Sequence, residues 1–268
     1  MSEAIAGVTD QTTRDSLGKI MRQGNSAVPQ TTGAPMGREI DLLCDYPKSK
    51  RAPRVVTEQE RAIARKFGRD FFDGDRRLGY GGYKYDPRFW TATVRRMRDY
   101  YALHDAAMIL DVGCGRGFML YDFRCLMPHA YLQGIDISRY AVASATLAHL
   151  VQIASSSAND LPFDLETLPC RYGDKPGFDL VISINTIHNL PLIDCKEALR
   201  EIMRVKKLDD QGGHAFITVD AWRNEAEREA MEAWNLTALT MMSTDDWKQL
   251  FADVGYTGDY YWFIPELT

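Results

Sequence analysis

The sequence contains no apolar run that approaches the roughly 20 residues needed to span a bilayer. Its first residues, MSEAIAGVTDQTTRDSLGK, also lack the apolar core of a signal peptide. A basic excess is missing too: the net charge is −5, whereas general binders of nucleic acids or membrane surfaces usually carry a positive charge. We therefore expect a cytoplasmic protein without a nucleic-acid or membrane partner.

Cysteine is scarce, with five residues in a chain of 268, and none occurs at C-x-x-C spacing. Their odd number and scattered positions argue against a disulfide framework and against a zinc knuckle. The histidine and acidic residues show no clear metal-ligand spacing either, so we predict no required metal. The cysteine pattern again indicates a reduced, cytoplasmic protein.

The chain divides into three predicted parts. Residues 1–37 are polar and rich in Gly, Pro, Ser and Thr, which predicts a mobile N-terminal arm. Residues 38–106 are expected to form a helical cap or lid region. One helix is predicted over 57–74, where Thr57 and Glu60 form a capping box, and a second begins at Asp86 with Pro87 at its first position. Residues 107–268 form the third part.

This third part alternates between strands and helices. Apolar strands such as MILDVG, YLQGIDI and FDLVISIN are each followed by a segment with helical periodicity. Alternation of this kind predicts an α/β domain with a mainly parallel sheet that is covered on both faces.

The sharpest motif is ILDVGCGRGFML, where a buried strand ends at an acid and then enters an alternating glycine loop before a helix. Small residues let a backbone approach a ligand closely, and the helix N-terminus presents free N–H groups. The G-x-G-x-G spacing differs from the G-x-G-x-x-G of dinucleotide-binding proteins. The motif places Asp111, Gly113, Cys114, Gly115 and Gly117 together at a candidate nucleotide site.

The loop DVGCGRG resembles that of class I S-adenosylmethionine-dependent methyltransferases. Asp136 ends the next strand, 25 residues after Asp111, and matches the acid that accepts hydrogen bonds from both ribose hydroxyls in that family. A carboxylate suits this role because it only accepts hydrogen bonds and can take two donors. SSSANDLPF is similar to the family's adenine-contacting segment, although Ser157 stands where many members have an acid.

The resemblance covers about residues 107–265 and implies a Rossmann-like class I methyltransferase fold. Its sheet would be mainly parallel and seven-stranded, with YTGDYYWFI as a last antiparallel strand and the cap region as an N-terminal helical extension. The implied cofactor is S-adenosyl-L-methionine. The residues implied to bind it follow the first four strands: Asp111, Gly113, Cys114, Gly115, Gly117, Asp136, Ile137, Ser157, Ala158, Asn159 and Asn185.

Candidates for chemistry follow the fourth strand in INTIHNL, because ligands bind at the carboxyl ends of strands in open α/β sheets. Asn185 and His188 are the catalytic candidates. A neutral imidazole is available near pH 7, so His188 is the candidate base for a hydroxyl acceptor. Asn189 is a candidate substrate residue. The alternative for His188 is a buried structural histidine.

The fifth strand ends at TVDAWRN, which brings Asp220, Trp222 and Arg223 to the same edge of the sheet. An Asp–Arg pair there could hold a polar or anionic substrate. The competing interpretation, which the sequence slightly favours, is a helix-capping acid and a solvated arginine.

The stretch GYGGYKYDPRFW combines flexible glycines with large aromatic side chains just before the first strand of the sheet. A cover over a cleft must bend and must exclude water, and tyrosine faces can also attract a cation. We therefore predict Tyr80, Tyr83 and Tyr85 as lid residues.

The favoured function is methyl transfer to a small polar molecule such as a sugar, nucleotide-sugar or secondary metabolite, by O-methylation. N-methylation of a small amine, or methylation of a protein or RNA, is the alternative. A non-catalytic binding module that keeps the cofactor fold is disfavoured by the intact acid and glycines. A homodimer is compatible with the sequence.

Overall fold

The computed structural model describes residues 37–47, 55–145, 147, 149–168 and 176–264. The predicted arm, residues 1–37, lies outside the described residues except for Gly37. Residues 35–268 belong to one compact unit, so the cap and the sheet domain pack together.

The seven strands form one sheet in the order β3-β2-β1-β4-β5-β6, with β7 also paired to β5. Every residue of β1 is buried, as expected for a parallel strand with helices on both faces. The strands are β1 (Met108–Val112), β2 (Tyr131–Asp136), β3 (Gln152–Ser155), β4 (Leu180–Ile184), β5 (His214–Trp222), β6 (Met242–Ser243) and β7 (Asp259–Phe263). This confirms the predicted Rossmann-like, mainly parallel sheet.

The orientation of the last strand differs from the prediction. β7 runs parallel to β5, in register from Phe216 opposite Asp259 to Asp220 opposite Phe263, and not antiparallel. The reason is the helix α9 (Thr244–Val254), which separates β6 from β7. A helical crossover returns the chain in the same direction, whereas an antiparallel strand follows from a tight hairpin.

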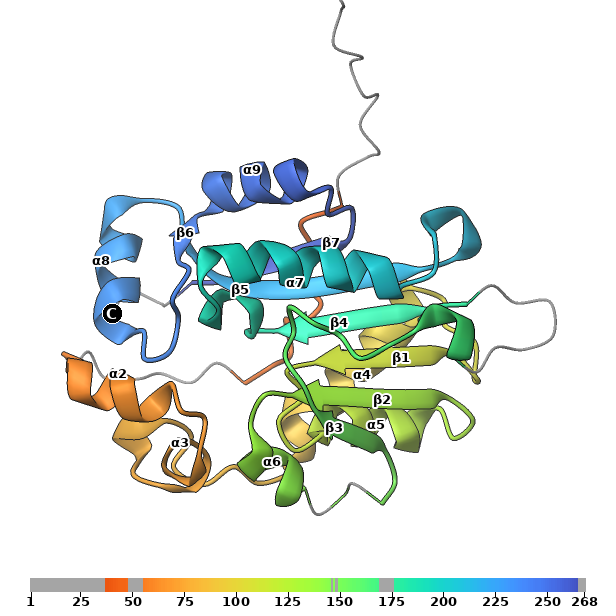
Figure 1. Ribbon diagram of the computed structural model, residues 1–268, viewed down its shortest axis with the longest axis horizontal. Helices are drawn as coiled ribbons and strands as arrows, with labels where there is room; N and C mark the ends of the chain where they lie inside the picture. Colours follow the sequence, from red (N-terminus) through yellow and green to blue (C-terminus); the bar gives the residue numbers. More distant parts are fainter. Residues whose placement is uncertain (1–36, 48–54, 146, 148, 169–175, 265–268) are drawn as a thin grey trace, which may run out of the picture. The chain divides into compact units, whose positions relative to one another are not determined.

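Two helical layers cover the sheet (Figure 1). The first is α4 (Pro87–Tyr100) with α5 (Phe118–Leu126), which share a core with β1 through side chains such as Met97 and Phe123. The second is α7 (Leu192–Val205) with α9, which share the other core through side chains such as Leu199 and Trp247. Asp86 caps α4 and Pro87 occupies its first turn, as predicted.

The remaining helices lie at the ends of strands or in loops. They are α6 (Arg139–Ala143), α8 (Glu225–Trp234), and the short 3₁₀ helices η1 (Arg76–Leu78), η2 (Leu165–Thr167), η3 (Ile187–Asn189) and η4 (Asp209–Gln211). Within the described residues, no helix combines the length and the apolar character needed to cross a bilayer.

The first part of the predicted cap region contains two short helices, α2 (Glu58–Ala64) and α3 (Arg69–Asp73), instead of the single helix predicted over 57–74, and the word cap refers below to these two helices. The capping box of Thr57 and Glu60 begins α2 as expected. The helix ends because Phe67 adopts a left-handed backbone conformation with φ +47°, and Gly68 then starts α3 in an extended conformation.

A buried ion pair lies at the end of the sheet where β1 and β4 begin. Lys207 Nζ lies 2.7 Å from one carboxylate oxygen of Asp179, and the backbone N–H of Met108 donates to the other at 2.7 Å. Both charged side chains are buried, so each depends on the other to offset its loss of hydration.

Candidate cofactor and substrate site

The carboxyl ends of β1, β2 and β4 point to the edge of the sheet where α2, α3 and α6 lie (Figure 1). β1 has β2 on one side and β4 on the other. The chain passes from β1 to β2 and β3 on one side, and then returns to the other side of β1 to form β4. This is the switch point at which open parallel sheets bind ligands. The predicted site residues come from the loops at this edge.

The glycine loop after β1 depends on its glycines for both conformation and space. Gly113, Gly115 and Gly117 have φ values of +86°, +56° and +74°, which residues with a Cβ atom rarely adopt. A Cβ on Gly113 would also lie 2.1 Å from the hydroxyl of Thr186. Cys114 is buried within the loop, and burial raises the pKa of its thiol well above the ordinary value. At these glycines the loop therefore presents backbone atoms, without side chains, to the neighbouring residues.

Asp136 lies at the end of β2, directly beside this loop. One carboxylate oxygen accepts the backbone N–H of Gly115 at 2.7 Å, and the other accepts that of Ser138 at 2.7 Å. An ionised carboxylate has about four acceptor sites, so each oxygen keeps capacity for a further donor. Burial raises the pKa of Asp136 although both N–H groups oppose it.

Asp111 lies at the floor of the same site, on β1. Its side chain is buried, and burial together with the nearby charge of Asp136 raises the pKa of its carboxyl to about 8. The carboxyl of Asp111 is therefore mostly protonated at pH 7 in the absence of a nearby cation.

The loop after β3 lies next to Asp136, because Ser156 N donates to the backbone oxygen of Asp136 at 3.2 Å. Ser157 forms an isolated antiparallel bridge with Asp160, and Ala158 is buried between them. The side chain of Asn159 donates instead to Asp194 of α7 at 3.0 Å. Ile137, directly after Asp136, is 57% exposed and presents an apolar surface at this side of the site.

Asn185 follows β4 and has a strained backbone, with φ +50°. Its backbone N–H and its side-chain oxygen both bond to the hydroxyl of Thr218 on β5, at 3.0 and 2.8 Å. The exposed side chain keeps a free amide nitrogen among the described residues. Asn189 donates to the backbone oxygen of Asn185 at 3.3 Å, and its own side-chain oxygen is buried without a donor among the described residues. Strain and an unpaired buried acceptor are both features that cluster at functional sites.

His188 is buried, 3% exposed, and both of its ring nitrogens have partners. The backbone N–H of Asp220 donates to Nδ1 at 3.3 Å, so the ring proton is on Nε2, which lies 3.3 Å from the carboxylate of Asp220. Burial lowers the pKa of this histidine, although Asp220 opposes the shift. In this arrangement His188 has no free lone pair for a substrate proton.

Asp220 and Arg223 do not form the pair that a substrate clamp would need. Asp220 is buried and also accepts a hydrogen bond from the side-chain amide of Asn235. Arg223 is exposed and pairs with Glu227 of α8 at 2.6 Å. The sequence misses this arrangement because Asn235 and Glu227 are brought to these side chains only by the fold. Trp222, at the end of β5, is half-buried.

The three lid tyrosines lie in the segment that crosses the glycine loop. Tyr83 packs against Phe118 of α5 with ring centroids 4.9 Å apart, and its ring is within 3.1–3.4 Å of where a Cβ on Gly115 would lie. Tyr80 is 43% exposed and packs on Tyr83 at 4.4 Å. Tyr85 donates to Asp122 of α5 at 2.6 Å. The segment thus lies over the loop.

A model of the methyltransferase domain matches residues 103–255, more than half of the chain. The chain belongs to this methyltransferase family. The expected enzyme class and its cofactor, S-adenosylmethionine, are thereby confirmed. A search of the curated proteins found no match.

Solved structures to which this chain is similar include the YcgJ protein of Bacillus subtilis, at 19% identity and a TM-score of 0.46 over 59% of this chain. Another is phosphoethanolamine N-methyltransferase 2 of Haemonchus contortus in complex with S-adenosyl-L-methionine, at 17% identity and a TM-score of 0.50 over 72% of this chain. The matches span 65% and 44% of those chains, less than two thirds of either.

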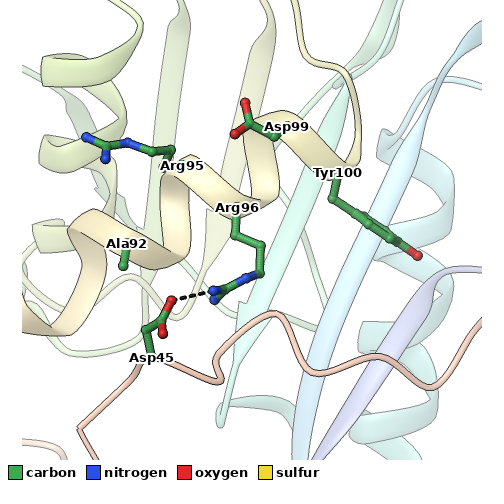
Figure 2. Close-up of a pocket in the computed structure, with 6 residues that line it drawn as sticks. All are labelled: Asp45, Ala92, Arg95, Arg96, Asp99 and Tyr100. Atoms are coloured by element: carbon green, nitrogen blue, oxygen red, sulfur yellow. Dashed lines mark hydrogen bonds and ion pairs between the residues drawn. The ribbon is translucent and has the colours of Figure 1, made fainter.

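Two cavities of this methyltransferase lie away from the glycine loop. One, of about 440 Å³, opens along the last turns of α4, where Arg96 pairs with Asp45 (Figure 2). The other, of about 330 Å³, lies where β5 and β7 begin, beside His214 and Asp259. Neither is lined by a predicted site residue.

Two charged side chains of the methyltransferase site are not among the residues predicted from the sequence. Arg116 lies inside the glycine loop and is buried, and it pairs with Asp73 at the end of α3. An arginine between the second and third glycines of the motif was the available signal, because a charged side chain there needs a partner when the loop is covered.

Proposed function

We propose that this methyltransferase acts on a small polar molecule that is held beneath the cap. The observation that carries this proposal is the attachment of the cap on both sides of the strand ends. On one side Arg61 donates to the backbone oxygen of Glu232 at 2.9 Å and Arg65 to that of Ala238 at 3.2 Å. On the other side Tyr83 lies on the glycine loop. A cap attached on both sides would limit access to the strand ends, which suits a small molecule better than a polymer.

We infer that Asp136 binds the ribose hydroxyls of S-adenosylmethionine with the acceptor sites that Gly115 and Ser138 leave open. The backbone of the glycine loop, with its positive φ angles, would face the methionine portion of the cofactor. The exposed side chain of Ile137 and the loop at Ser157 would contact the adenine. These assignments follow from position and chemistry.

The acceptor atom that fits this site best is an amine nitrogen. The sequence favours O-methylation with His188 as base, but both ring nitrogens of that residue are engaged and its side chain is buried. An amine that arrives unprotonated needs no base, whereas a hydroxyl does. The unpaired side-chain oxygen of Asn189 is an acceptor suited to an N–H group.

The bound cofactor supplies an activated methyl group on a sulfonium. The task of the protein is therefore to align the acceptor and to exclude water. Asn185, held in its strained conformation by Thr218, would present its amide at the end of β4. The faces of Tyr80 and Tyr83 would cover the reacting groups and attract the positive charge.

The proposal is tested by incubating the protein with S-adenosylmethionine that carries a ¹³C-labelled methyl group and with fractionated cell extract. We expect label in the low-mass fraction, with a carbon chemical shift that identifies an N-methyl group. An O-methyl product would overturn the proposal that the acceptor is an amine nitrogen and would favour a hydroxyl acceptor. Label in protein or RNA would overturn the small-molecule substrate. The same reaction without the extract controls for self-methylation.

A further inference from the structure

Asp73, the last residue of α3, connects four separate segments through one carboxylate. One oxygen accepts the backbone N–H of Tyr83 at 3.1 Å and Nη1 of Arg116 at 3.4 Å. The other accepts Nη2 of Arg116 and the hydroxyl of Tyr140 at 2.7 Å. The cap, the lid segment, the glycine loop and α6 therefore meet at a single side chain.

Arg116 reaches this carboxylate from within the glycine loop. Its Nε donates to Ser144 at 3.0 Å, and its Nη1 donates to the backbone oxygen of Tyr83 as well. The guanidinium lies 6.0 Å from the ring centre of Tyr83 and 5.8 Å from that of Tyr140. Its side chain is only 10% exposed, so it has little water to replace lost protein partners. Bidentate pairing of this kind fixes geometry as well as charge.

The carboxylate of Asp73 stays charged over the physiological pH range. Burial alone would raise the pKa of Asp73, but hydrogen bonds from Arg116 and Tyr140 outweigh it and lower the pKa to about 2. The contact between Asp73 of the cap and Arg116 of the loop therefore persists at these pH values. It breaks when the cap moves away from the loop, and protonation of Asp73 does not break it.

The position of Tyr83 depends on this contact. Both its backbone N–H and its backbone oxygen are held by the Asp73–Arg116 pair, while its ring lies against Gly115, the residue that precedes Arg116. The lid residue and the loop beneath it are therefore fixed to one another through two neighbouring residues of the loop.

We propose that Asp73 and Arg116 are positioning residues that hold Tyr83 closed over the glycine loop, and that the cofactor and its product leave only when this pair separates. The inference rests on the proposed function in one respect, the binding of S-adenosylmethionine beside this loop. The pair controls how long the cofactor stays, while Asp136 controls the ribose contact itself.

The test is the dissociation rate of S-adenosylhomocysteine, the product of methyl transfer, measured by stopped-flow chase with excess S-adenosylmethionine. Asp73→Asn should dissociate at least about tenfold faster than the unmodified protein, because the neutral amide cannot hold the guanidinium in the same way. Asp70→Asn is the matched control: it removes the same charge from the same helix, and Asp70 is exposed. Its rate should not change.

Two further variants separate positioning from a general loss of structure. Arg116→Gln should accelerate dissociation by a similar factor, and the effect of the double variant should be smaller than the product of the two single effects, because both remove the shared ion pair. Arg116→Lys keeps the charge but loses the bidentate geometry, so its dissociation rate should lie between those of the unmodified protein and Arg116→Gln. Thermal melting checks that each variant is folded at the assay temperature.

Equal dissociation rates for Asp73→Asn and the unmodified protein would overturn the proposal, and so would additive effects of the two single variants. Failure of the unmodified protein to bind S-adenosylhomocysteine at all would instead contradict the cofactor site. The two failures are therefore distinguishable.

Discussion

If the cofactor places a positive charge beside Asp111, changing this residue to asparagine should remove most of the pH dependence of cofactor binding. In the structure the pKa of Asp111 is raised to about 8 by burial and by Asp136. S-adenosylmethionine is positively charged at its sulfonium and its amino group, and a nearby cation favours the ionised carboxylate. With such a cation beside Asp111, binding would lower this pKa and release the proton, so affinity would rise with pH.

The size of the effect follows from the fraction of Asp111 that is ionised before binding. With a pKa of about 8, roughly 1 molecule in 100 is ionised at pH 6 and roughly 1 in 10 at pH 7. The apparent dissociation constant equals the intrinsic one divided by that fraction. It should therefore fall about tenfold between pH 6 and pH 7, with close to one proton released per cofactor bound.

Isothermal titration at both pH values, each in two buffers with different heats of protonation, measures the affinity and the proton count together. The range stays below pH 7.5 so that the cofactor's own amino group, with a pKa near 8, remains charged. For Asp111→Asn the dissociation constant should change with pH far less than for the native protein. A native protein whose affinity changes less than twofold, with no proton released, would refute the reasoning.

One further measurement on Asp111→Asn and two further variants test the account. Asp111→Asn should raise the melting temperature at pH 8 but not at pH 4. The reason is that the raised pKa of Asp111 makes the free energy of unfolding of the native protein fall as pH rises from about 4 to about 8. A stabilisation by Asp111→Asn that is larger at pH 4 than at pH 8 would contradict this. Lys207→Met should lower the free energy of unfolding by about 3–5 kcal/mol in urea titrations, since it leaves the buried carboxylate of Asp179 without its lysine partner, and a loss below about 1 kcal/mol would contradict this. His188→Asn should keep turnover of the identified substrate at pH 7 within about tenfold, while a loss of a thousandfold or more would restore the histidine as a base.

The parts of the site that the sequence predicts well are set by neighbouring residues. The alternating glycines require positive φ values whatever surrounds them, and Asp136 ends a strand whose apolar pattern is plain from the sequence. The capping box at Thr57 is local in the same sense. These features therefore need no knowledge of tertiary contacts.

The parts that sequence reasoning could not supply depend on residues far apart in the chain. His188 and Asp220 are 32 positions apart, and only the packing of β5 beside β4 makes them partners. Asp73 and Arg116 are 43 apart and meet because the cap lies on the loop. The direction of β7 depends on a helical crossover, which the apolar pattern of the strand itself does not encode.

The most direct test of the cofactor site is the dissociation constant of S-adenosylmethionine for Asp136→Ala, measured by isothermal titration beside the unmodified protein. Two charge-assisted hydrogen bonds of about 1.5–3 kcal/mol each would be lost, so the constant should rise at least about a hundredfold. Asp210→Ala, which removes an exposed acid at the opposite edge of the sheet, should leave it unchanged. We predict that the unmodified protein and Asp210→Ala bind S-adenosylmethionine tightly and that Asp136→Ala binds it weakly. Equal dissociation constants for all three proteins would contradict the account.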